Sequence, residues 1–212
     1  FIFLLICFQG FIGWYMVSSG LVDRVDVSHF RLSVHLLVAF LILSLIFWFY
    51  LNLANIEIKK NNLKSKFSFI FLFLVFCQIV IGAFVSGMDA GKIYNSWPLM
   101  GSSYFPNDNS LINLFNIKSF SDPSLVQFMH RNLAYIILFF YFYLLFKIYK
   151  NKLSFFYKSI NTIGFLLILQ IILGIFTLLS GAQIILSSMH QISSIFLVSS
   201  CIYFLYINSK TN

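Results

Sequence analysis

Three histidines lie inside apolar stretches of the sequence, each in a similar setting. His35 falls in RLSVHLLVAF, His130 in QFMHRNLAYI and His190 in SSMHQISSIF. An imidazole is costly in hydrocarbon, so a histidine there either makes hydrogen bonds in the protein interior or takes part in chemistry. Its ring nitrogens bind transition metals and transfer protons. A single histidine of this kind favours a packing role, whereas three in matching positions indicate ligands.

The histidines belong to a threefold repeat. The stretches QGFIGWYMVSSG from Gln9, QIVIGAFVSGMD from Gln78 and QIILGIFTLLSG from Gln170 each hold a glutamine and, four residues later, a glycine near the end of an apolar run. A loop and then a histidine-containing run follow each stretch. The pattern predicts three helical hairpins, with one histidine on the second helix of each. All three histidines are expected about one to two turns from the end at which the hairpins close.

Two such hairpins make a four-helix bundle, and bundles bind cofactors between facing helices. Two imidazoles, one from each hairpin, supply both axial nitrogens of a six-coordinate haem. In the complete unit formed by the last two hairpins these are His130 and His190. Zinc is disfavoured because its sites need three or four protein ligands, and no Cys or carboxylate accompanies the histidines. A proton path would need Asp or Glu in the spans.

Six apolar segments position these side chains. Of the 212 residues, 60% are apolar and 9% charged, and the mean hydropathy of +0.91 exceeds what a soluble core requires. Helices satisfy the backbone of such segments in lipid, and the alternation typical of a membrane barrel is absent. The predicted fold is an all-α integral membrane protein of three repeated hairpins, one complete four-helix bundle plus half of another. The spans are expected at about 1–19, 31–53, 67–87, 125–149, 159–180 and 183–206.

The net charge of +8 arises from lysines in short loops, which argues against a nucleic-acid partner. Lysines gather in the second and fourth loops, and Lys210 lies near the C-terminus. The positive-inside rule therefore predicts that these loops and the C-terminus face the cytoplasm or matrix. The loops on the histidine side are predicted to face outward, and they hold Asp23, Asp26, Asp89, Asp108 and Asp122.

Several side chains on the outer side have two interpretations. Arg131 follows His130 and points about 100° around the helix, where its guanidinium could snorkel to the interface or pair with a haem propionate. His29 precedes the second span and is expected to be exposed at the interface. The loop 88–124 combines glycine, proline and aromatic residues, which favours an ordered lid over the site. An aromatic anchor at headgroup level is the alternative.

The segments GWYMVSSGLVDRVDVSHFRLSVHL, residues 13–36, and GAFVSGMDAGKIYNSWPLM, residues 82–100, resemble two regions of the haem A synthase family. Those membrane enzymes convert haem O to haem A for cytochrome c oxidase. QFMHRNLAY and SSMHQ fall where that family has its second pair of histidines, and the likeness covers essentially the whole chain. Because the family has eight helices in two similar halves, the resemblance implies that this chain is the C-terminal part of a longer protein.

The resemblance also implies a division of labour. Residues 1–66 would be the second hairpin of the N-terminal half, where haem O binds as substrate at His35 and at a histidine outside the chain. Residues 67–212 would form the C-terminal bundle, in which His130 and His190 ligate haem b. The family oxidises the C8 methyl of haem O to a formyl group and depends on a glutamate beside the missing histidine. No acidic residue here lies in a predicted span, so no catalytic residue is assigned.

The resemblance implies haem O synthase and cytochrome c oxidase assembly factors as partners, and a bacterial inner membrane, with the mitochondrial inner membrane as the alternative. Two other classes of protein stay open. A membrane cytochrome b that passes electrons between a quinone and a partner usually has two histidines on one helix at different depths, whereas each helix here has one. A transporter is also built from repeated hairpins, but it tends to have broken helices and polar midplane groups, and the predicted spans offer little of either.

Overall fold

The computed structural model describes residues 1–20, 26–54, 56, 58 and 63–210. Over these residues the chain is helical and contains no β-strand, which confirms the predicted all-α class. Five of the helices, α2 to α6, are long and apolar enough to cross a membrane, whereas α1 has 16 residues. The six α-helices are α1 Ile2–Val17, α2 His29–Leu53, α3 Ser65–Gly87, α4 Pro123–Lys150, α5 Tyr157–Leu179 and α6 Ile184–Ser209.

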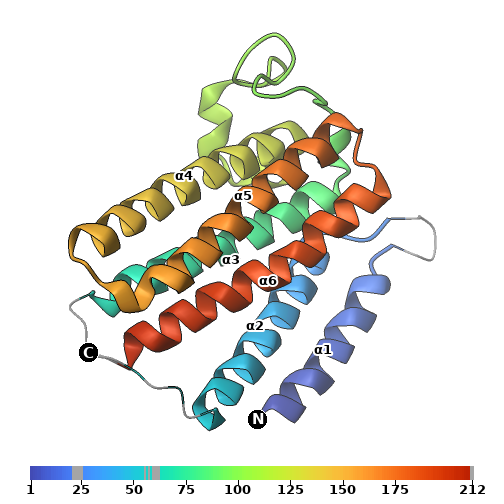
Figure 1. Cartoon of the computed structure of the whole chain (residues 1–212). Coiled ribbons are helices and arrows are strands. Elements are labelled where there is room, and N and C mark those ends of the chain that lie inside the picture. Colours follow the sequence, from blue (N-terminus) through green and yellow to red (C-terminus); the bar gives the residue numbers. More distant parts are fainter. Residues whose placement is uncertain (21–25, 55, 57, 59–62, 211–212) are drawn as a thin grey trace.

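The helices alternate in direction along the chain, so that the C-terminal end of α1, the N-terminal end of α2, the loop 88–122 and the turn 180–183 gather at one end of the molecule (Figure 1). We call this the loop end. Helices α3 to α6 form a closed four-helix unit, in which each helix packs on the next and α6 returns to α3. Helices α4 and α6 therefore lie diagonally across this unit. Helix α2 packs on both α3 and α6, and α1 packs on α2.

Local signals set the helix ends at the loop end. Pro123 opens α4, where its missing N–H costs nothing, and the Asp122 carboxylate accepts a hydrogen bond from the Leu125 backbone N–H at 3.0 Å. Helices α5 and α6 are joined by a tight turn in which Gly181 and Ala182 have φ of +70° and +62°. Left-handed backbone at two successive residues stops α5 and reverses the chain.

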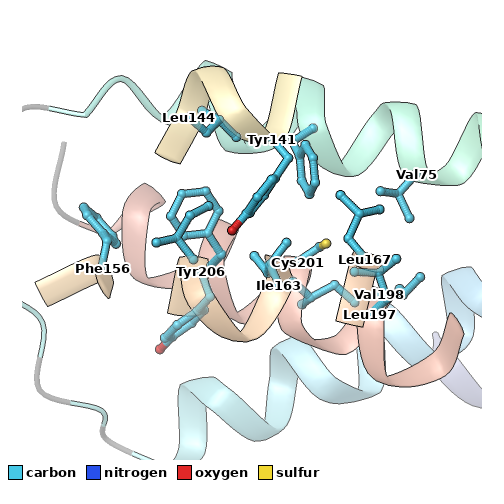
Figure 2. Close-up of a cluster of buried hydrophobic side chains, with 14 of the residues drawn as sticks. Val75, Tyr141, Leu144, Phe156, Ile163, Leu167, Leu197, Val198, Cys201 and Tyr206 are labelled. Atoms are coloured by element: carbon cyan, nitrogen blue, oxygen red, sulfur yellow. The ribbon is translucent and has the colours of Figure 1, made fainter. Parts of the chain in front are cut away.

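The tightest apolar packing lies in the half of the four-helix unit away from the loop end. Figure 2 shows Tyr141 and Leu144 of α4 facing Ile163 of α5 and Cys201 of α6. Gly164 permits this approach, because a Cβ there would lie 2.0 Å from the Tyr141 hydroxyl oxygen. His130 and His190 lie in the other half, nearer the loop end.

Candidate functional site

Each of the three histidines is gripped by the glutamine of its own hairpin. The glutamine Nε2 on the first helix donates a hydrogen bond to the main-chain carbonyl of the histidine on the second helix. That oxygen has a second lone pair free beyond its helical bond, so the side-chain bond ties the two helices together without breaking either. The donor–acceptor distances are 2.9 Å for Gln9 to His35, 3.0 Å for Gln78 to His130 and 3.0 Å for Gln170 to His190.

The glycine four residues after each glutamine makes room for the imidazole. Residues four apart lie on the same helix face one turn apart, so the glutamine and the glycine face the same histidine. A Cβ added at Gly13, Gly82 or Gly174 would lie 3.1, 3.0 or 3.2 Å from the Cε1 of its histidine, closer than ordinary van der Waals contact. We call each set of glutamine, glycine and histidine a histidine seat. The glutamine–glycine repeat in the sequence is thereby explained.

The seats contain polar atoms that no described residue satisfies. His130 Nδ1 and His190 Nδ1 are buried and have no hydrogen-bond partner among the residues that the structure describes, and the same holds for the Oε1 of Gln78 and Gln170. Buried polar groups without partners are uncommon in folded proteins and often mark a functional site. The two imidazoles are therefore held in place by their main chain and by glycine packing, and the Nδ1 of each is left for another group.

The structure brings His130 and His190 into one four-helix unit and places His35 outside it, on α2. His130 and His190 lie on the diagonal helices α4 and α6, six or seven residues after the first residue of each helix, which is about two turns from the loop end. Within the described residues no group of three or more His, Cys, Asp or Glu side chains could hold a metal ion. A pair of imidazoles suits a metal that brings its other ligands with it, as haem iron does.

Arg131 binds the long loop rather than pointing free into the interface. Its Nη1 donates to the carbonyl oxygens of Ser96 at 2.9 Å and Leu99 at 3.2 Å, and its Nη2 donates to that of Tyr94 at 3.0 Å. A planar guanidinium can bridge several acceptors in this way. From the sequence, the Arg131 guanidinium was expected either to reach the membrane interface or to pair with a haem propionate. Neither interpretation included binding to the loop 88–122. Contact of Arg131 with an anionic group stays a prediction.

The loop 88–122 is ordered and attached to α4 and α5, as its composition predicted. It contains three short 3₁₀ helices and lies at the loop end of the molecule (Figure 1). Gln127, Arg131, Asn132 and Tyr135 of α4 all hold it. Besides the Arg131 bonds, the contacts are Gln127 Nε2 to the Tyr94 carbonyl at 3.1 Å, Tyr104 hydroxyl to Asn132 at 2.6 Å, Trp97 Nε1 to the Tyr135 hydroxyl at 3.1 Å and Asn95 Nδ2 to the Leu178 carbonyl at 2.9 Å.

Asp108 joins two parts of this loop to α4. The Ser124 hydroxyl donates to one carboxylate oxygen at 2.6 Å and the Tyr94 hydroxyl to the other at 3.0 Å. The bond from Ser124, with that from Tyr94, lowers the pKa of Asp108 although partial burial opposes the shift. Burial and the bond to Asp108 raise the pKa of Tyr94. At neutral pH the pair therefore consists of a carboxylate and a neutral phenol.

Comparison with known proteins identifies the family of the chain. A family model described as "Cytochrome oxidase assembly protein" matches residues 1–202. The chain belongs to this family. Proteins named "Heme A synthase" match almost all of it: that of Pelagibacter ubique is 49% identical over 209 residues, which cover 99% of this chain and 62% of the relative. Those of Rickettsia bellii strain OSU 85-389 and Flavobacterium johnsoniae are 40% and 39% identical, over 95% and 96% of this chain and 61% of each relative.

This member of the cytochrome oxidase assembly family thus spans a little over three-fifths of the length of those relatives. Its described acidic residues, Asp26, Asp89, Asp108 and Asp122, all lie between helices at the loop end. Asp23 and Glu57 lie outside the described residues. Within the described helices there is accordingly no carboxylate beside His35, His130 or His190, and no catalytic acid or base is assigned in the chain.

His29 differs from the expectation that it is exposed in a loop. It is the first residue of α2, and its ring packs edge-on against Phe84 of α3, with centroids 5.5 Å apart and an interplanar angle of 89°. Its Nε2 is buried, and a Cβ at Gly87 would lie 2.8 Å from the His29 Cβ. The expectation was wrong because the end of α3 approaches α2 through a glycine, which sequence spacing does not reveal.

Two cavities of the family member lie away from the seats. One of about 550 Å³ lies among α2, α5 and α6 near the end opposite the loops, and Phe47, Lys158, Phe196 and Tyr203 are among its lining residues. Another of about 480 Å³ is lined by His29, by Pro123 at the start of α4 and by residues between helices such as Ser28. Neither is lined by His35, His130 or His190. The imidazoles are packed against their glycines, and the observations that favour a ligand there are the seats and their unsatisfied nitrogens.

Proposed function

We propose that this chain is the greater part of a haem A synthase, in which the unit α3–α6 holds a haem b. The carrying observation is the pair of matching seats that presents His130 and His190 from diagonal helices with their Nδ1 atoms unsatisfied. The similarity to proteins named "Heme A synthase" supports the same reaction, the oxidation of the haem O C8 methyl to a formyl group. Since the chain covers only part of those relatives, the reaction is a property proposed for the longer protein.

His130 and His190 would supply the two axial nitrogens of the haem b, and the apolar helices would supply its walls. A six-coordinate haem of this kind transfers electrons without binding substrate at its iron. This chain's own contribution is to hold the imidazoles: the glutamines fix the helix at the level of each histidine, and the glycines fix the ring. Arg131 lies next to His130 and is the candidate partner of a haem propionate, while it also holds the loop 88–122.

His35 would belong to a second site, for the substrate haem O. Its seat resembles the other two, but its hairpin α1–α2 is not accompanied by a second hairpin in the chain. We therefore assign residues 1–66 to an incomplete substrate-binding half and residues 67–212 to the haem b half. The farnesyl tail of haem O is apolar, which accounts for a site between membrane helices.

The same proposal includes the setting of the protein. The chain is an integral membrane protein by its helices, and its relatives are bacterial, so we assign it to a bacterial inner membrane. Several lysines lie at the end opposite the loops, and by the positive-inside rule we assign that end and the C-terminus to the cytoplasmic side. They include Lys64, Lys147, Lys150, Lys158 and Lys210. Haem O synthase, as the source of substrate, and cytochrome c oxidase assembly factors are the partners that the proposal implies.

The test is to identify the haems that the protein holds. This chain and its full-length parent are produced in cells that also make haem O, purified, and analysed by acid extraction, chromatography and mass. We expect haem B in both and haem A only from the parent. The double variant His130→Ala/His190→Ala should lose the haem B, because both axial ligands are gone.

The controls separate the competing functions. Gln127→Leu removes a bond to the loop one turn from His130 and should retain haem B, which shows that loss in the histidine variant is not general unfolding. Haem B in a parent that makes no haem A would favour a membrane cytochrome b. No haem in either protein would return the histidines to a packing role.

A further inference from the structure

Each of the two seats of the four-helix unit holds a buried amide oxygen and a buried ring nitrogen, and neither atom has a hydrogen-bond partner among the described residues. In each of the two seats of the four-helix unit, the glutamine amide nitrogen is engaged by the histidine carbonyl, while the amide oxygen is unsatisfied. The orientation of the amide is fixed, because only its NH₂ group can donate to a carbonyl. The free end of the side chain is therefore the acceptor Oε1. The imidazole Nδ1 of the same seat likewise has no partner among the described residues.

An imidazole that binds a metal through Nε2 carries its proton on Nδ1. In most sites that N–H donates to a carboxylate, a carbonyl or water, which fixes the ring and makes the ligand nitrogen more electron-rich. Within the described helices no carboxylate is available for this purpose near His130 or His190. The glutamine of each seat supplies a buried amide oxygen that has no partner among the described residues.

In the present position of the His130 ring, the ring lies close to the Gln78 amide. Gln78 Nε2 is 3.3 Å from His130 Nε2 as well as 3.0 Å from the His130 carbonyl oxygen. A turn of the ring about its Cβ–Cγ bond, a soft torsion, moves Nε2 away from the glutamine and Nδ1 toward it. Gly82 leaves the space against which the ring turns.

We propose that Gln78 and Gln170 are positioning residues for the axial histidines: Nε2 of each amide holds the histidine main chain, and Oε1 accepts the Nδ1–H of the imidazole when its Nε2 binds haem iron. This inference rests on the proposed function. The inference predicts that the reduction potential of the haem depends on how strongly the side chain at each position accepts a hydrogen bond. A residue that only bridges two helices would not show this dependence.

The test compares glutamate and leucine at both positions in the full-length protein. Glutamate is a stronger acceptor, so Gln78→Glu and Gln170→Glu should lower the reduction potential of the haem that depends on His130 and His190. Leucine accepts nothing, so Gln78→Leu and Gln170→Leu should raise that potential and weaken haem binding about 10-fold. Redox titration and the electron paramagnetic resonance spectrum of the oxidised haem measure both effects.

Gln9→Leu is the matched control, because it removes the same bond at His35 and should leave this haem's potential and spectrum unchanged. If both substitutions at a position shift the potential in the same direction, or neither shifts it, the glutamines only join helices and the inference is wrong while the proposed function stands. If the wild-type protein holds no haem that depends on His130 and His190, the proposed function is wrong and the inference is lost with it.

Discussion

The three hairpins share one histidine seat, but they differ in how they close at the loop end. Helices α5 and α6 are joined by the short turn 180–183, whereas α3 and α4 are joined by the loop 88–122, which folds back on α4. The seats nonetheless keep nearly the same distances, with glutamine-to-carbonyl bonds of 2.9 to 3.0 Å. The position of each histidine is thus set between the helices, and the loops are free to serve other purposes.

An arginine near each of the first two histidines shows the same contrast. Arg31 lies one turn before His35, donates to the Tyr15 carbonyl oxygen at 2.7 Å and covers the Tyr15 ring at 3.7 Å, so it closes its own hairpin. Arg131 instead holds carbonyl oxygens of the long loop. Both arginines lie near the loop end, but Arg31 binds α1 and Arg131 binds the loop 88–122.

Replacing the glycine of a seat by alanine should displace the histidine of that seat. Gly82→Ala and Gly174→Ala put a Cβ within 3.0 and 3.2 Å of a histidine Cε1, so each ring has to move by a few tenths of an ångström. We expect each substitution to weaken binding of the haem b about 10-fold, because an axial ligand tolerates little displacement. Haem content after dilution and repurification measures the loss.

The control for these glycines lies in α1. A Cβ at Gly10 would meet no atom within 4 Å, so Gly10→Ala should leave the haem b in place. Gly13→Ala should act on the His35 seat alone. Equal haem content in Gly82→Ala, Gly174→Ala and Gly10→Ala would contradict the idea that the glycines hold the rings.

Lysine substitution at Arg131 and at Arg31 tests whether only Arg131 restrains the loop 88–122. Lysine cannot reproduce the fork that reaches three carbonyl oxygens, so Arg131→Lys should loosen the loop 88–122. With at least one charge-assisted bond lost, at roughly 1.5–3 kcal/mol each, we expect opening of the loop to increase about tenfold or more. Trypsin cleavage after the exposed Lys118, followed by mass, measures that opening in lipid nanodiscs. Arg31→Lys should not change the cleavage rate, and an equal effect of both substitutions would refute the contrast.

A smaller effect should appear in the pH dependence of the loop. The pKa of Asp108 is lowered in the folded protein, so its bonds contribute stability above the usual carboxyl pKa and lose it as the pH falls through the lowered value. We expect a spin label on Phe115→Cys, with the native cysteines replaced by alanine, to become more mobile on acidification. The Asp108→Asn protein should be mobile already at neutral pH and respond less. Identical pH profiles would show that Asp108 does not restrain the loop.

Much of the fold could be predicted because an apolar run of this length forms a helix when it crosses a bilayer. All six predicted spans overlap helices of the structure. The common depth of His35, His130 and His190 followed from counting residues. The grip of the glutamines on the histidine carbonyls could not be predicted in the same way, since it depends on the rotation of each helix. The repeated Gln and Gly were its only signal in the sequence.

The contacts of Arg131 were missed for a related reason. Its partners are main-chain oxygens of Tyr94, Ser96 and Leu99, which every residue type has, so nothing in the sequence marks them. Gln127, a buried polar residue one turn before Arg131, was the available hint, and it donates to Tyr94 as well. His29 was misplaced because a glycine contact between α2 and α3 determines its burial.

The seats are local in the sequence, and this has a consequence for the order in which the protein forms during membrane insertion. Each glutamine grips a histidine on the very next helix, so a hairpin can complete its seat as soon as its second helix has left the insertion machinery. The proposed haem b site needs α4 and α6, so it can form only once the hairpin α5–α6 has joined the hairpin α3–α4. Haem loading would then follow the formation of the seats, in hairpins that have already set their own geometry.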